Sequence, residues 1–278
     1  MVECMKHQKK ILVIHDLACY GRCAMTVIVP ILSAYGAEVV PVPTTLLSSN
    51  GAFPNYYKQE LTEAMRGIFQ HFEELEVTFD MVIIGYLVNY EQAMLIKEVL
   101  PKLMKPDALV ILDPIMGDNK RLYSVTSNEV VKGYQELVRV ADMITPNVTE
   151  CLALINEDLS SEVSTSKLIE RLKTAGAKNI IITSVTKKDQ LTNVVSLLDN
   201  EIVSLPVNRI EDQRSGTGDV FLGVLAGELA NGEEAISAVR YAADFISETL
   251  TDTLTYELPS NRGVVFEKSL KKLTKRIP

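Results

Sequence analysis

Short hydrophobic runs recur along the chain between longer amphipathic stretches. They are rich in valine and isoleucine and are continuous rather than alternating, which is typical of parallel strands covered on both faces of a sheet. Buried strands are predicted at Ile11–Ile14, Glu38–Val42, Met81–Ile84, Leu109–Leu112, Met143–Ile144 and Ile180–Ile182.

Stretches between and after these runs carry apolar residues at helical spacing. Helices are predicted at Tyr57–Glu74, Tyr90–Met104 (with Asn89 as N-cap), Ser127–Val140, Gly218–Ala230, Glu233–Thr249 and Asn261–Lys275. Strands that alternate with helices in this way predict an α/β fold with a mostly parallel sheet.

The pattern changes in the last third of the chain. Two β-type runs, Val194–Leu198 and Ile202–Leu205, flank Asp199-Asn200, a dipeptide suited to a tight turn. We therefore predict an antiparallel hairpin at the edge of the sheet. No linker, repeat or low-complexity tract interrupts the sequence, so a single domain spanning 1–278 is expected.

Charge and cysteine content narrow the possible functions. The chain has 28 basic and 36 acidic residues, a net charge of −8, which is not the positive footprint that nucleic acids select. Four cysteines without a Cys-x-x-Cys pair, and three histidines, favour reduced thiols over a disulfide framework or a structural zinc site. No apolar run is long enough for a membrane span or a signal-peptide core. We expect no nucleic-acid or membrane partner and a cytoplasmic location.

Polar residues follow four of the predicted strands at their carboxyl ends, where open α/β sheets bind ligands. Each group alone fits an ordinary turn or helix entry, but four at one edge of a sheet indicate a site. The groups are His15-Asp16, Asp113 to Asn119, Thr145 to Glu150 and Thr183-Ser184.

The motif Gly216-Thr217-Gly218-Asp219 opens a predicted helix. Backbone N–H groups at a helix N-terminus bind anions, and glycines let a phosphate come close. Asp219 has an ordinary explanation as a helix-capping group, but beside an anion site its carboxylate would repel phosphate. It makes chemical sense as a base that takes the proton of an attacking hydroxyl. The motif therefore favours phosphoryl transfer. The dinucleotide fingerprint, the P-loop, the protein-kinase motifs and the hydrolase elbow are not found in the sequence.

These residues resemble the ribokinase superfamily and, within it, the pyridoxal kinases. Gly216 to Asp219 alone specifies the superfamily. The motifs that narrow it to kinases for vitamin B6 or for the thiamine pyrimidine are Asp113 to Asp118, Thr145 to Glu150 and Gly85-Tyr86-Leu87, and the stretches Ile11 to Gly21 and Thr44 to Ser49 fit the same family. The resemblance covers nearly the whole chain.

The resemblance implies a ribokinase-like three-layer α/β/α sandwich, with a mostly parallel central sheet and an antiparallel edge hairpin. It implies ATP-dependent phosphorylation of the 5′-hydroxymethyl group of pyridoxal, pyridoxine or pyridoxamine, as in the salvage of vitamin B6 to pyridoxal 5′-phosphate. It also implies that Mg²⁺ is required, that a monovalent cation such as K⁺ activates, and that the protein is a homodimer.

The same resemblance assigns roles to individual residues. Catalysis is assigned to Asp219, as the base, and to the amides of Gly216, Thr217 and Gly218. ATP binding is assigned to Asp113, Thr145, Asn147, Glu150, Thr183, Ser184 and Gly218. Mg²⁺ is assigned to Asp113 and Glu150, mostly through water. The alcohol substrate is assigned to Asp16, Thr44, Tyr86 and Asp219, and the 118–123 segment to a loop over the nucleotide.

One position departs from the family pattern. Many pyridoxal kinases have a serine where Asp16 stands, and an aspartate would accept a hydrogen bond from the ring in its place, so the preferred vitamer stays open. Three alternatives also stay open: a hydroxymethylpyrimidine kinase, a sugar or nucleoside kinase, and a non-catalytic B6-binding protein. In hydroxymethylpyrimidine kinases this motif generally looks like Gly-Thr-Gly-Cys, with a cysteine at the position of Asp219. Sugar kinases usually carry an additional early β-lid, and the intact acidic positions argue against a non-catalytic protein.

Overall fold

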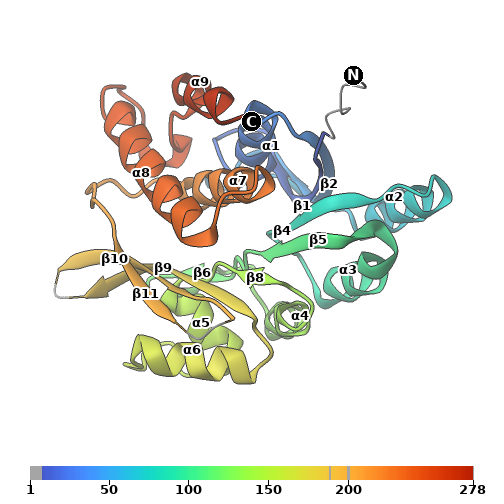
Figure 1. Cartoon of the computed structure of the whole chain (residues 1–278), viewed down its shortest axis with the longest axis horizontal. Coiled ribbons are helices and arrows are strands. Elements are labelled where there is room, and N and C mark those ends of the chain that lie inside the picture. The colour runs from blue at the N-terminus through green and yellow to red at the C-terminus, as the bar shows by residue number, and fades with distance from the viewer. Residues whose placement is uncertain (1–7, 188, 199–200, 278) are drawn as a thin grey trace, which may run out of the picture.

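The computed structural model describes residues 8–187, 189–198 and 201–277. Within these ranges, nine strands form one central sheet in the order β11-β10-β9-β8-β5-β4-β1-β2-β3 (Figure 1). The strands are β1 (Lys10–Ala18), β2 (Glu38–Leu47), β3 (Lys58–Glu60), β4 (Phe79–Ile84), β5 (Met104–Leu112), β8 (Met143–Ile144), β9 (Asn179–Lys187), β10 (Gln190–Ser196) and β11 (Ile202–Pro206).

The middle of this sheet is parallel and both of its edges are antiparallel. Strands β9, β8, β5, β4, β1 and β2 pair in parallel, whereas β10 and β11 form an antiparallel hairpin at one edge and β3 pairs antiparallel with β2 at the other. The predicted strands and the predicted edge hairpin are therefore confirmed. The predicted turn at Asp199-Asn200 lies outside the described residues.

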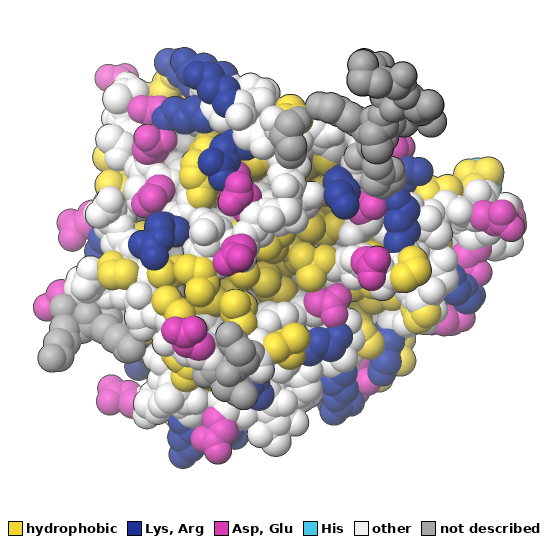
Figure 2. Space-filling view, in the orientation of Figure 1, with side chains coloured by type: hydrophobic (Ala, Val, Ile, Leu, Met, Phe, Trp, Pro, Cys, Tyr) yellow, Lys and Arg dark blue, Asp and Glu magenta, His cyan; other side chains and the backbone are white. Residues whose placement is uncertain are grey.

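Helices cover both faces of the sheet, as Figure 1 shows. One face carries α1 (Met25–Ala34), α7 (Thr217–Ala230), α8 (Ala235–Thr253) and α9 (Leu270–Leu273). The other carries α2 (Thr62–Glu74), α3 (Tyr90–Leu103), α4 (Asn128–Val138), α5 (Val148–Leu154) and α6 (Thr165–Thr174). Along β1, alternate side chains enter the two cores, which explains the unbroken apolar run and confirms the three-layer α/β/α architecture. Hydrophobic side chains reach the surface across the middle of the face in Figure 2.

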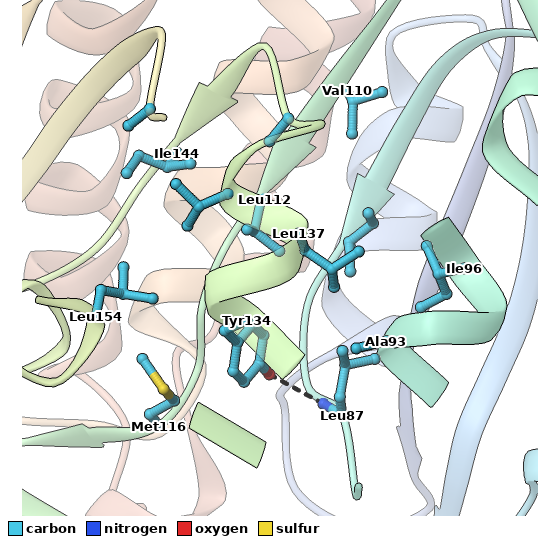
Figure 3. Packing of buried hydrophobic residues seen from close by; sticks show 14 of the residues in the cluster. Leu87, Ala93, Ile96, Val110, Leu112, Met116, Tyr134, Leu137, Ile144 and Leu154 are labelled. Atoms are coloured by element: carbon cyan, nitrogen blue, oxygen red, sulfur yellow. Dashed lines mark hydrogen bonds between the residues drawn. The ribbon is translucent and has the colours of Figure 1, made fainter. Parts of the chain in front are cut away.

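A buried tyrosine of α4 fixes the turn after β4. The Tyr134 hydroxyl accepts a hydrogen bond from the Leu87 N–H (3.0 Å) and donates one to the Gly85 carbonyl (2.9 Å). The Tyr134 side chain lies among the buried apolar residues shown in Figure 3. Because these two bonds bracket Tyr86, the helical layer sets the position of one predicted ring-binding residue.

Two predicted helices differ from the structure. Residues 58–60 form β3, paired with β2 through Thr45 and Glu60, so α2 begins only at Thr62. No continuous helix spans 261–275, because Gly263 interrupts it. Gly263 has φ +79°, and a Cβ there would lie 2.5 Å from the Arg22 carbonyl oxygen. Short 3₁₀ turns at Ser260–Arg262, Glu267–Ser269 and Thr274–Arg276 accompany the single turn of α9 instead.

Several short elements were not predicted. Helix α1 is apolar along most of its length, so it shows little helical periodicity. The sequence analysis also did not predict helices α5 and α6, or the two-stranded ribbon of β6 (Gly117–Asp118) and β7 (Arg121–Leu122). In the described part of the chain, no helix is both long and apolar enough to cross a membrane.

Candidate active site

A cleft of about 720 Å³ lies at the carboxyl ends of the central strands and reaches the start of α7. Its walls include every residue that the sequence assigned to ATP, to Mg²⁺ or to the glycine motif: Asp113, Thr145, Asn147, Glu150, Thr183, Ser184, Gly216, Thr217, Gly218 and Asp219. The fold thus brings segments far apart in the sequence to one place, although the individual roles of these residues stay predictions.

The glycine motif forms the N-terminus of α7 inside this cleft. Gly216 has φ +79°, and a Cβ there would lie 2.1 Å from the Arg22 carbonyl oxygen, so the turn requires glycine. Thr217 Oγ1 donates to the Arg214 carbonyl (2.9 Å) and holds the turn closed. At Gly218 a Cβ would meet no atom within 4 Å. The first-turn amides, which have no earlier helical acceptor, therefore lie at an open surface suited to an anion.

Two carboxylates line the cleft, Asp113, which is half-buried, and Glu150, which is buried. Asp113 Oδ1 accepts a hydrogen bond from Thr145 Oγ1 (2.9 Å), and burial, with added repulsion from Asp219, raises the pKa of Asp113 to about 7. Burial, followed by repulsion from Asp113, raises the pKa of Glu150 well above its usual value. A divalent cation beside such a pair would offset this repulsion.

Asn147 and Glu150 also have a structural function. They form a capping box at the start of α5, in which Asn147 Oδ1 accepts from the Glu150 N–H (3.0 Å) and Glu150 Oε2 accepts from the Asn147 N–H (2.8 Å). Asn147 Nδ2 donates to the Gly117 carbonyl (2.8 Å). Both residues therefore keep this wall of the cleft rigid, whatever ligand they contact.

Thr183 and Ser184 continue the same wall on β9. The Thr183 N–H donates to the Pro146 carbonyl (2.9 Å), which holds Thr183 beside the start of α5. Ser184 has φ +57°, and its N–H donates to Asn193 Oδ1 (3.1 Å). This middle part of β9 is thus fixed by both of its neighbours.

Of the residues assigned to the alcohol, Asp219 lines this cleft, whereas Asp16, Thr44 and Tyr86 do not. Tyr86 and Asp16 share one neighbourhood, because burial, followed by the charge of Asp16, raises the pKa of Tyr86 to about 12. Lys58 belongs to it as well: its ammonium lies 3.5 Å from the Tyr86 hydroxyl, and burial lowers its pKa against the opposing attraction of Glu60 and Asp16. Thr44 differs, since its hydroxyl donates to the Tyr86 carbonyl (2.8 Å) and supports the backbone at Tyr86.

A model of the phosphomethylpyrimidine kinase family matches residues 57–264, which is well over half of the chain. The chain belongs to this family. It is therefore a kinase with a ribokinase-like fold, as the sequence motifs predicted.

Relatives of this kinase fall into two groups by substrate. It is 27% identical over 237 residues to a pyridoxal kinase of Dictyostelium discoideum (79% of this chain, 78% of the relative). It is 33% identical over 155 residues to a hydroxymethylpyrimidine/phosphomethylpyrimidine kinase of Haemophilus influenzae (54% of this chain, 58% of the relative).

Solved structures agree with the fold along almost the full length. A protein of Bacteroides thetaiotaomicron, provisionally named a phosphomethylpyrimidine kinase and crystallised with pyridoxal, is 33% identical and superposes with a TM-score of 0.91 over 96% of each chain. Pyridoxal kinase of Leishmania donovani in complex with ADP and pyridoxamine shares the fold, with 23% identity and a TM-score of 0.83 over 96% of each chain.

Two features of the kinase site were not assigned from the sequence. The first is an apolar part of the cleft wall, formed by Val207 after β11 and by Ile246 and Leu250 of α8. In the sequence, only the helical spacing of apolar residues in α8 indicates it. His15 is the second: it is buried directly between Asp16 and Asp219. Its place in the sequence next to Asp16 was visible, but its contact with Asp219 depends on the fold.

Proposed function

We propose that this kinase transfers the γ-phosphoryl group of ATP to the 5′-hydroxymethyl group of a B6 vitamer: pyridoxal, pyridoxine or pyridoxamine. The observation that carries the proposal is the position of Asp219. Its buried carboxylate lies in the first turn of α7, next to the open amides and on the side of the cleft that leads to Asp16 and Tyr86. A base at the junction of an anion site and a ring pocket suits phosphorylation of a ring-borne alcohol.

The ring pocket supports a hydroxypyridine. Asp16 accepts from a protonated ring nitrogen or from a ring hydroxyl, Tyr86 lies against a ring face, and Lys58 supplies a cation close to both. A B6 ring carries a basic nitrogen and an acidic hydroxyl, so one carboxylate and one ammonium match its two polar ends.

On the nucleotide side, the first-turn amides of α7 bind the transferred phosphoryl group and stabilise the charge that develops on it. Mg²⁺, when bound, neutralises phosphate charge, and Asp113 and Glu150 fit it because both are acidic, both line the cleft, and the charge of Asp113 raises the pKa of Glu150. Among the described residues no group of three or more acidic, His or Cys side chains is arranged around one metal position, which suits an ion held mainly by water and phosphate oxygens.

The transfer itself depends on Asp219. Its carboxylate takes the proton of the substrate hydroxyl as the oxygen attacks phosphorus, and the bond from phosphorus to the ADP oxygen breaks. The apolar residues around the cleft limit the access of water, which would otherwise compete with the alcohol.

Hydroxymethylpyrimidine is the second candidate substrate. It has a specific observation in its favour, namely the match to the phosphomethylpyrimidine kinase family and to the Haemophilus influenzae relative. The aspartate at position 219 and the pyridoxal-bound Bacteroides structure favour the B6 vitamers instead.

A parallel assay tests the proposal. ADP release is measured with ATP, Mg²⁺ and each of pyridoxal, pyridoxine, pyridoxamine and hydroxymethylpyrimidine, with an alcohol-free sample for background hydrolysis, and the products are identified by mass and ³¹P NMR. The proposal expects the highest kcat/KM with a B6 vitamer and a phosphate ester at its 5′ position. Turnover of hydroxymethylpyrimidine alone would select the second candidate.

A further inference from the structure

We propose that His15 is a positioning residue that joins the substrate-recognising carboxylate, Asp16, to the catalytic base, Asp219. This proposal rests on the proposed function, because it assumes that the two carboxylates serve recognition and catalysis. His15 was assigned no role by the sequence motifs, and it contacts both groups at once.

The geometry is a short chain of three side chains. His15 Nδ1 lies 2.8 Å from Asp16 Oδ1 and also 2.8 Å from the Asp16 backbone nitrogen, and His15 Nε2 lies 3.2 Å from Asp219 Oδ1. The imidazole is 1% exposed. Its Nε2 atom has no partner of full hydrogen-bond geometry, so the atom is buried, polar and directed at the base.

The fold leaves a space of fixed shape for this ring. A Cβ on Gly85, at the end of β4, would lie 2.0 Å from His15 Cδ2 and 2.3 Å from Nε2. The Gly85 carbonyl in turn is held by Tyr134. The imidazole therefore lies against a fixed backbone, and it can hold two carboxylates in place better than a flexible side chain could.

The charges around the ring favour the imidazolium form. Burial lowers the pKa of His15, but the contacts with Asp16 and Asp219 outweigh burial and raise the pKa to about 10. The other titratable groups nearby are Asp113 at the end of β5, and Cys23 in the segment before α1, whose thiol pKa is raised by burial and by both carboxylates. Lys58 and Tyr86 lie near Asp16, and Tyr123 lines the same cleft as Asp219.

An imidazolium donates from both nitrogens, one to each carboxylate, and so uses one oxygen of each. The second oxygen of Asp219 then faces the substrate hydroxyl, and the second oxygen of Asp16 faces the ring. In this arrangement, substrate binding at Asp16 and proton removal at Asp219 depend on the same imidazole.

Two near-isosteric variants separate the two contacts. His15→Gln keeps a donor near the Nε2 position, toward Asp219, and His15→Asn keeps one near Nδ1, toward Asp16. We expect His15→Gln to raise the KM for the alcohol about tenfold while kcat stays within about threefold of wild type. We expect the reverse for His15→Asn: an alcohol KM close to wild type and kcat lower by about ten- to a hundredfold. The KM for ATP should stay unchanged in both.

Equal losses in both variants, or wild-type kinetics in both, would overturn the proposal, since a purely structural histidine gives no crossed pattern. The assay uses whichever alcohol the wild-type enzyme phosphorylates best. Failure of B6 phosphorylation would therefore count against the proposed function alone.

A measurement on the wild-type enzyme covers the case in which a variant fails to fold. In ¹⁵N-histidine-labelled protein at pH 8, both His15 nitrogens should carry protons, while His71, which is exposed on α2, serves as the internal reference. The Asp16 backbone N–H also lies 2.8 Å from His15 Nδ1. A neutral His15 that accepts this N–H at Nδ1 would contradict the proposal that the imidazolium donates to both carboxylates.

Discussion

Gly85 and His15 are complementary in shape: the missing side chain of one is the space that the ring of the other fills. A Cβ on Gly85 would lie 2.0 Å from His15 Cδ2, closer than any real contact allows. Gly85 directly follows β4, and His15 belongs to β1, so the ends of these two strands pack together beside Asp219, the candidate base.

Gly85→Ala is expected to displace the imidazole and to cost about 1–3 kcal/mol of stability, the usual range for overpacking a buried site. Turnover should fall with it, because Asp219 loses its neighbour. Gly67→Ala is the matched control: it lies on the exposed side of α2, where a Cβ meets nothing within 4 Å. That variant should gain roughly 0.5–1 kcal/mol from helix propensity and keep full activity. Urea unfolding and kcat on both proteins check this pair.

Gly218→Ala separates ligand binding from folding. Apart from its neighbours in the same helical turn, no atom lies within 4 Å of a Cβ at this position, so the fold should be unchanged. The methyl group would stand in front of the first-turn amides, however, and should raise the KM for ATP about tenfold or more by keeping phosphate away. Gly216→Ala should instead lower the melting temperature, because of its positive φ and the close Arg22 carbonyl. A normal KM for ATP in a folded Gly218→Ala protein would count against phosphate binding at this turn.

The stability of the ligand-free protein should depend on pH through Asp113. Its pKa is raised to about 7 by burial, against roughly 3.9 in an unfolded chain. Between these values the folded state keeps a proton that the unfolded state has released, so stability falls as the pH rises through this window. Asp113→Asn removes that loss and can still accept from Thr145. Its melting temperature in EDTA should exceed wild type by roughly 3–8 °C at pH 8 and by much less at pH 4. An equal shift at both pH values would show that ionisation of Asp113 is not the cause.

The strands and the nucleotide side of the site could be predicted from the sequence because their signals are local. Valine-rich runs mark buried strands, and three of the four polar groups that follow them line the cleft as expected, whereas His15-Asp16 does not. Elements whose form depends on distant contacts were not predicted correctly. β3 forms because β2 offers it an edge, and the last helix is interrupted where Gly263 packs on Arg22.

His15 shows the same limit within the site. In the sequence it is part of a polar group at the end of the first predicted strand, and only the folded chain brings it to Asp219. Thr44 is a partial case: it is near the predicted pocket, but its hydroxyl bonds to the main chain of Tyr86. The roles of the site residues, the requirement for Mg²⁺, activation by K⁺ and a homodimer stay predictions.

Asp219→Asn tests the central claim most directly, because asparagine keeps the size of the side chain and its place in the first turn of α7 but cannot take the hydroxyl proton. Turnover of ATP with the preferred alcohol is measured on one preparation together with the melting temperature and ATP affinity. The account predicts a folded protein with equal or tighter ATP binding and a kcat lower by roughly 10²–10⁴-fold. A folded Asp219→Asn protein that retains more than about a tenth of the wild-type kcat would contradict it.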